Sequence, residues 1–169
     1  MANERPPVVE QIVVVRHAHY HQTFLTEEGK AQSRRLGEQL NKIRKGDGKC
    51  HTWICFSSSE WRAVETSLYV AHCLDDPFFD LHTADELNGD NPTVTMESLA
   101  QYARRCSSML FVVHSNNVVK VMWGVMKQFG FNPETPWPWH GEWNAVYPTQ
   151  GAVINMKTGE VSEISGYAA

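Results

Sequence analysis

The stretch Val8-Val9-Glu10-Gln11-Ile12-Val13-Val14-Val15 decides the fold class of this 169-residue chain. It is an almost unbroken run of β-branched residues, which is typical of a strand buried on both faces of a parallel sheet. The run stops at Arg16-His17. Residues 109–113 form a second apolar run, which also ends at a histidine, His114. Two buried strands with polar ends predict a mainly parallel sheet that binds a ligand at one edge.

Segments with helical periodicity separate the predicted strands. Thr26 can cap a helix that begins with Glu27-Glu28 and stops at Gly46, because a hydroxyl group and acidic residues both favour a helix N-terminus. The other predicted helices are residues 60–74, capped by Ser59, residues 95–106 and residues 117–129. The other predicted strands are residues 52–56, residues 78–81 and a C-terminal hairpin of residues 152–156 and 161–164. This alternation predicts one α/β domain over residues 1–169, a three-layer α/β/α sandwich with a mostly parallel central sheet and a C-terminal edge hairpin.

Composition and charge argue against several function classes. The chain has 42% hydrophobic and 20% charged residues, as ordinary globular domains do. Its formal net charge of −4 provides no basic surface, so we expect no nucleic-acid partner. No apolar run reaches the roughly 20 residues that span a bilayer, and the first ten residues lack a signal-peptide pattern, so we expect no membrane partner and a cytoplasmic location. The four cysteines lack CxxC spacing, which favours reduced thiols over a disulfide frame or a zinc site.

Residues suited to phosphate chemistry follow three of the predicted strands. They are Arg16 and His17 after the first strand, Arg62 after the strand at residues 52–56, and His114 after the strand at residues 109–113. Phosphoryl transfer needs fixed positive charge for the phosphoryl oxygens and an in-line nucleophile. Nearby guanidinium groups disfavour imidazolium and so lower a histidine pKa. These residue types therefore predict His17 as the nucleophile and His114 as a donor to the phosphoryl oxygens.

Four motifs, in this order along the chain, resemble the histidine phosphatase (phosphoglycerate mutase-like) superfamily. They are Arg16-His17-Ala18, Leu25-Thr26-Glu27-Glu28-Gly29-Lys30-Ala31-Gln32, Ser57-Ser58-Ser59-Glu60-Trp61-Arg62-Ala63-Val64-Glu65-Thr66 and Phe111-Val112-Val113-His114. Within the superfamily, the segments that begin at Arg16, Arg62 and His114 look most like the mitochondrial branch that works as a Ser/Thr protein phosphatase. Two positions depart from the family pattern, since Ala18 and Ser59 stand where a Gly and a Pro are usual.

The resemblance implies a metal-independent phosphomonoester hydrolase with a phosphoglycerate mutase-like fold and no cofactor. It implies that His17 is phosphorylated during turnover and that Arg16, His17, Arg62 and His114 bind the phosphoryl group. It also implies a general acid after the third strand, for which Glu86 is the first candidate. Asp85 and Asp90 are the alternatives. The implied partner is a phosphorylated protein or a small phosphate ester.

Other hypotheses stay open from the sequence. A small-molecule phosphatase or a phosphoglycerate mutase can use the same residues, although the short segment between Glu86 and His114 favours an open hydrolytic pocket. A binding module that has lost turnover would also keep the phosphate pocket. His17, His19 and His21 alternate, a spacing that is also compatible with a metal site of HxHxH type. The sequence does not define an oligomeric state, and a homo-oligomer is compatible with it.

Overall fold

The computed structural model describes residues 9–45, 52–76, 79–89, 92, 99, 102, 106–131 and 146–167. Its elements, in chain order, are β1 (Gln11–Arg16), β2 (Tyr20–His21), β3 (Phe24–Leu25), α1 (Glu27–Lys45), β4 (Trp53–Ser58), α2 (Trp61–Cys73), β5 (Asp80–Ala84), η1 (Asp85–Leu87), β6 (Ser108–Val113), η2 (Ser115–Asn117), α4 (Val118–Gln128), β7 (Gln150–Asn155) and β8 (Val161–Ser165). The helix predicted at residues 95–106 lies mostly outside the described residues.

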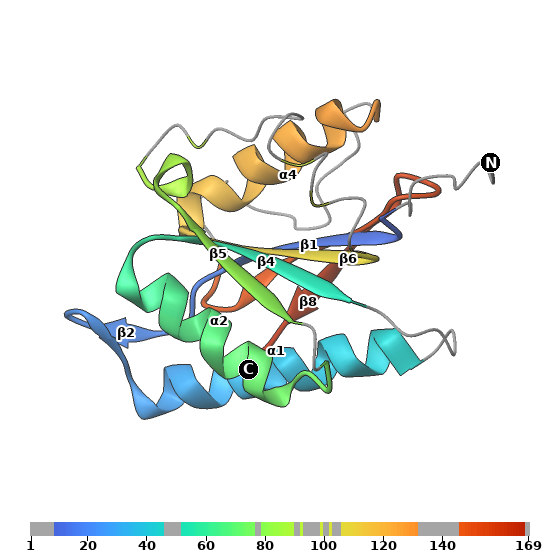
Figure 1. The fold of residues 1–169 in the computed structure, drawn as a ribbon. Coiled ribbons are helices and arrows are strands. Elements are labelled where there is room, and N and C mark those ends of the chain that lie inside the picture. Colours follow the sequence, from blue (N-terminus) through green and yellow to red (C-terminus); the bar gives the residue numbers. More distant parts are fainter. Residues whose placement is uncertain are drawn as a thin grey trace.

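A six-stranded sheet forms the middle layer, in the order β5-β4-β6-β1-β7-β8 (Figure 1). Strands β5, β4, β6 and β1 are parallel, whereas β7 and β8 join them as an antiparallel pair. Helices α1 and α2 cover one face of the sheet and α4 covers the other (Figure 1). The predicted three-layer fold with a C-terminal edge hairpin is therefore confirmed.

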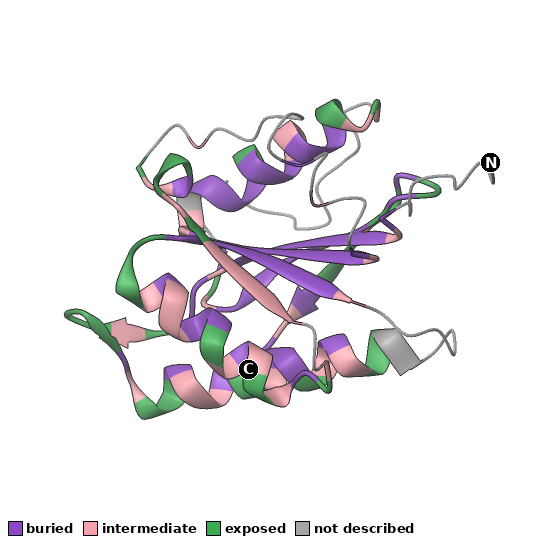
Figure 2. Ribbon diagram, viewed as in Figure 1, coloured by how far each residue is buried: buried purple, intermediate pink, exposed green. Residues whose placement is uncertain are grey.

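The β-branched run in β1 explains why this strand lies inside the sheet. Its side chains alternate between the two faces, because successive residues of a strand point in opposite directions. Ile12 and Val14 belong to the core layer that includes Met122 of α4. Val13 and Val15 belong to the opposite layer, with the apolar residues of α1 and α2. Figure 2 shows the resulting burial of the central strands, whereas the edge strand β5 is only partly buried.

Of the two predicted helix caps, one is confirmed and the other is wrong. The cap of α1 is confirmed, because the backbone N–H of Gly29 donates to Thr26 Oγ1 at 3.1 Å. The predicted cap of α2 is wrong: the N-cap residue is Glu60, without a side-chain cap bond, and Ser59 Oγ accepts from Asn88 instead. The strand predicted at residues 78–81 overlaps β5, which spans Asp80–Ala84, while residue 78 lies outside the described residues.

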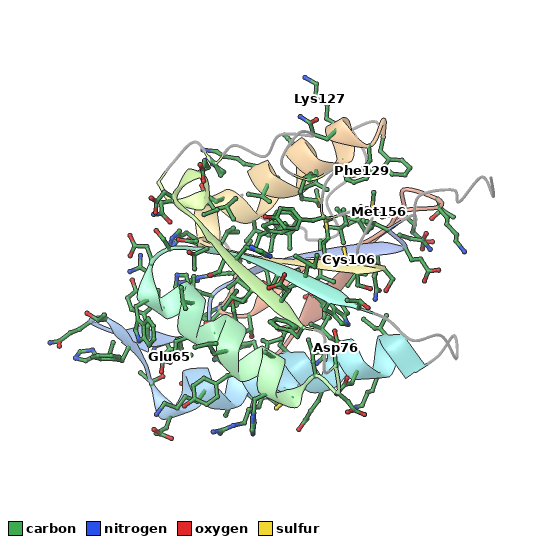
Figure 3. The ribbon with its side chains drawn as sticks, in the orientation of Figure 1. Glu65, Asp76, Cys106, Lys127, Phe129 and Met156 are labelled. Carbon is green, nitrogen blue, oxygen red and sulfur yellow. The ribbon has the colours of Figure 1, made fainter. Side chains whose placement is uncertain are left out.

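A short hairpin of β2 and β3 was not predicted from the sequence. It connects β1 to α1, and the backbone N–H of Leu25 donates to Glu65 Oε2 at 3.0 Å. Glu65 projects from α2 on the side where the hairpin lies (Figure 3). This bond ties the hairpin, and Tyr20 with it, to the helix that carries Arg62.

The predictions about the cysteines and about membrane-spanning segments can be compared with the fold. Cys55 and Cys106 are buried thiols in the two core layers, and burial raises the pKa of Cys55. Cys73 is a partly buried thiol in α2, and Cys50 lies outside the described residues. No helix in the described ranges is long and apolar enough to cross a membrane.

Candidate active site

The carboxyl ends of β1, β4 and β6 bring the four predicted phosphate-binding residues together. Because these strands run parallel and adjacent, the residues that follow them meet at one edge of the sheet. There they line a hollow of about 320 Å³. Its lining residues are Arg16, His17, Tyr20, Glu60, Arg62, Gly89, His114 and Ser115.

His17 is fixed in one tautomer by the backbone. Its side chain is buried, and its Nδ1 lies 2.9 Å from the carbonyl oxygen of Ala18. A carbonyl oxygen can only accept, so Nδ1 carries a proton and donates it. The Nε2 atom of the neutral ring therefore keeps its lone pair. This is the nitrogen that can form a bond to phosphorus.

The surroundings of His17 keep this ring neutral. The pKa of His17 is lowered to about 3, mainly by burial and to a smaller extent by the nearby His114, Arg16 and Arg62, against a contrary effect of the Ala18 carbonyl. The sequence pointed to the guanidinium groups as the cause, but burial is the larger contribution. A neutral imidazole is thus present at this position throughout the physiological pH range.

The loop that holds His17 is tied to α2. The backbone N–H of Ala18 donates to Thr66 Oγ1 at 2.9 Å, and the Thr66 hydroxyl donates to the Arg62 carbonyl at 2.7 Å. The backbone N–H of His17 donates to the Val113 carbonyl at 2.9 Å. These bonds hold the backbone of His17 and Ala18 against both neighbouring elements.

Each of the two arginines uses only some of its N–H donors in hydrogen bonds within the described structure. Arg16 Nη1 donates to the Val146 carbonyl at 2.8 Å, and Arg62 Nη1 lies 2.9 Å from Glu60 Oε2. The Arg62 guanidinium also stacks over the Tyr20 ring at 4.6 Å. In each arginine the buried Nε has no hydrogen-bond partner within the described structure. Both arginines line the hollow, where a guanidinium group can donate to a bound anion.

His114 is oriented by a chain of hydrogen bonds. The backbone N–H of Ser59 donates to Asn88 Oδ1 at 3.1 Å, which fixes that atom as an acceptor. The Ser58 hydroxyl must then donate to Asn88 Oδ1, so Ser58 Oγ accepts from the Glu60 backbone at 3.3 Å and from His114 Nε2 at 2.9 Å. The proton of neutral His114 is consequently on Nε2.

The charge state of His114 depends on its neighbours. Burial lowers its pKa, and Arg62 and Arg16 lower it further, whereas Glu60 acts in the opposite direction. His114 and His17 are also in edge contact, with ring centroids 5.2 Å apart. A dianionic ligand between them would favour the imidazolium form of His114, because an opposite charge stabilises it.

Two of the three candidate acids do not line the hollow. Glu86 and Asp85 are exposed residues of η1, and neither lines the hollow. Asp90 lies outside the described residues. The carboxylate that does line the hollow is Glu60. No sequence motif distinguished it, because its position before α2 suited a surface residue equally well.

The alternating histidines do not converge on one point. His17 is buried, whereas His19 and His21 are exposed, and His19 Nδ1 is hydrogen-bonded to Thr26 Oγ1 at 2.8 Å. Among the residues that the structure describes, no group of three His, Cys, Asp or Glu side chains could hold a metal ion. The chain leaves strand β1 at Arg16, so the period of two that would align the three rings does not continue.

Sequence reasoning did not identify Tyr20, Ser58 or Asn88 as parts of the site. Tyr20 contacts both His17 and Arg62, with its ring centroid 5.1 Å from that of His17. A signal for Ser58 existed, because it ends the buried strand β4. Asn88 lies 30 residues further along the chain than Ser58, and only the parallel pairing of β4 with β5 brings its loop close.

Several solved structures have the same fold. The protein histidine phosphatase SixA in complex with tungstate has a TM-score of 0.59 at 20% identity, with 92% of this chain and 97% of that chain covered. SixA of Agrobacterium tumefaciens, named as a phosphohistidine phosphatase, has a TM-score of 0.55 at 17% identity, with 92% and 95% covered. Phosphoglycerate mutase of Plasmodium falciparum has a TM-score of 0.50 at 19% identity, with 91% and 87% covered.

These similarities define the architecture of the chain. At such identities they show that it has the phosphoglycerate mutase-like α/β fold. No protein-family model matches the sequence, and no curated protein matches it.

Proposed function

We propose that this chain is a histidine phosphatase that hydrolyses phosphorylated substrates through a transient phosphohistidine at His17. One observation carries the proposal. The neutral imidazole of His17, with Nδ1 bound to the Ala18 carbonyl, lines a hollow together with two arginines that have unused donors. Such a site combines a nucleophile with the positive charge that a phosphoryl group needs.

The proposed first step transfers the phosphoryl group to the enzyme. The Nε2 lone pair of His17 attacks phosphorus in line with the bond to the leaving atom. Arg16 and Arg62 donate to the phosphoryl oxygens, and their planar guanidinium groups can each bond two of them. His114 becomes imidazolium beside the dianion and donates through Nδ1, since Nε2 is committed to Ser58. In the second step water attacks phosphorus and releases His17.

We further propose that side chains alone neutralise the phosphate charge, without a metal ion. The two arginines and His114 place up to three positive charges around one hollow. Strong chelation should leave the activity intact, while His17→Ala should abolish it. Activity lost in chelator and restored by zinc or manganese would contradict this proposal.

We propose a phosphorylated protein side chain as the substrate. Two similarities support a protein substrate: the structural neighbour SixA is a protein histidine phosphatase, and the sequence motifs resemble a Ser/Thr protein phosphatase branch. The substrates that these two similarities suggest differ in the leaving atom, which is nitrogen in phosphohistidine and oxygen in phosphoserine or phosphothreonine. A small sugar phosphate is the alternative substrate class for the same pocket.

The test is a screen of the purified full chain in chelator against phosphohistidine, phosphoserine and phosphothreonine peptides and small phosphate esters. We expect turnover that depends on His17 and competitive inhibition by vanadate, whose five-coordinate form resembles the transition state. No hydrolysis of any of these substrates, or vanadate binding no tighter than sulfate, would contradict the assignment.

A further inference from the structure

Glu60 occupies a place that the proposed phosphatase chemistry leaves unexplained. It is the one carboxylate among the described residues that line the hollow around His17. Its side chain is about half exposed, so it can exchange protons with solvent. Its backbone N–H bonds to Ser58 Oγ at 3.3 Å, which fixes the residue at the end of β4 beside His114.

The charge of Glu60 is directed at the phosphate-binding residues. Its Oε2 lies 2.9 Å from Arg62 Nη1, so it occupies a donor that a phosphoryl oxygen would need. It also acts electrostatically on His114. An anion that binds the Nη1 group of Arg62 must displace Glu60 from it. The displaced carboxyl group is then left at the mouth of the hollow, next to the anion.

A carboxyl group in this position is disposed to hold a proton. A dianionic phosphoryl group and a carboxylate repel each other, and repulsion of like charges favours the protonated acid. The contact between Glu60 and Arg62 is weakened once the guanidinium group turns to the phosphate. Substrate binding thus converts Glu60 from the partner of Arg62 into an acid beside the leaving atom.

We infer that Glu60 is the general acid and base of the proposed reaction, an inference that rests on the proposed function of His17. As the bond between phosphorus and the leaving oxygen breaks, the electron pair stays on that oxygen, which takes the proton of the Glu60 carboxyl group. The Glu60 carboxylate then accepts a proton from the attacking water. The water oxygen forms its bond to phosphorus, the P–N bond breaks, and its electron pair returns to His17 Nε2. The products are the alcohol and inorganic phosphate.

The position of Glu86 supports this choice by contrast. Glu86 is exposed in η1 and does not line the hollow, and Asp85 is exposed in the same turn. A general acid must come within hydrogen-bond reach of the atom that it protonates. Glu60 is better placed for this, since it lines the hollow and its carboxylate contacts the guanidinium group of Arg62.

The test compares Glu60→Gln with the matched control Glu86→Gln. A series of aryl phosphates from p-nitrophenyl to phenyl phosphate varies the leaving group, and rapid-quench measurement of phenol release isolates phosphoenzyme formation. Nitrophenolate departs without a proton, whereas phenolate is a poorer leaving group. We expect Glu60→Gln to slow the first step about tenfold or less for p-nitrophenyl phosphate and about 100-fold or more for phenyl phosphate. Glu86→Gln should resemble the unmodified chain with both.

Two further variants separate the possible outcomes. Glu60→Asp keeps a carboxyl group and should recover part of the loss with phenyl phosphate. Equal losses for all leaving groups in Glu60→Gln, or a selective loss in Glu86→Gln, would overturn the assignment of Glu60. Activity retained in His17→Ala would instead refute the proposed nucleophile, so the two failures are distinguishable.

Discussion

His17→Asn should reduce the loss of stability that the protein suffers in mild acid. The folded protein holds the pKa of His17 at about 3, whereas the ordinary value is 6.5. Below pH 6.5 the unfolded chain therefore binds a proton that the folded protein does not. The free energy of unfolding must fall as pH decreases through this window. One pKa unit corresponds to about 1.4 kcal/mol, so His17 should account for a loss of about 2 kcal/mol between pH 7 and pH 5.

The assay is urea unfolding of both proteins at several pH values in a buffer free of phosphate. Asparagine has no ionisable group, so the pH dependence of the variant should be shallower by about 2 kcal/mol over that interval. His114 contributes in the same direction in both proteins and cancels in the comparison. His21→Asn is the control, because its ring is exposed in the folded protein. An unchanged pH dependence in His17→Asn would refute the burial of a neutral His17.

Three other substitutions test separate parts of the account. Arg62→Lys keeps the charge but loses the planar fork, so steady-state kinetics should show kcat/KM about 10- to 100-fold lower; near-normal rates would mean that Arg62 supplies charge alone. Asn88→Ala removes the acceptor that orients Ser58 and His114, and initial rates with p-nitrophenyl phosphate should fall up to about tenfold. An unchanged rate would show that the orientation of His114 does not need this chain of bonds. Gly151→Ala would place a Cβ 1.9 Å from the Val14 carbonyl oxygen, so urea unfolding should show destabilisation of about 3 kcal/mol or more. Unchanged stability would contradict the close pairing of β1 with β7.

Local sequence patterns were sufficient to predict most of the fold. The β-branched run before Arg16 identified a strand with two buried faces, and Thr26 followed by two acids identified a helix start, because both signals depend on neighbouring residues only. The cap of α2 was predicted wrongly because Ser59 is engaged by Asn88, a partner that is distant in sequence. The hairpin of β2 and β3 was missed because each strand has two residues, too few to show a period.

The residues of the candidate site also divide into those that the local sequence predicts and those that depend on contacts distant in sequence. Residues directly after buried strands, such as His17 and His114, could be predicted to share a site because parallel strands end at one edge. Glu60 and Asn88 could not, since their places depend on how two loops approach each other at the edge of the sheet. The position of Glu86 likewise could not be derived from its spacing in the chain. The presence of Glu60 in the lining of the hollow is therefore a finding of the structure alone.

The most direct test of the account is identification of the phosphorylated residue during turnover. The full chain is mixed with excess p-nitrophenyl phosphate, quenched in alkali within the first turnover, digested and analysed by mass spectrometry. Alkali preserves a phosphohistidine adduct, and the account predicts one phosphoryl group on the peptide that contains His17, absent from His17→Ala. A phosphoryl group on a different residue, or continued turnover by His17→Ala, would contradict it.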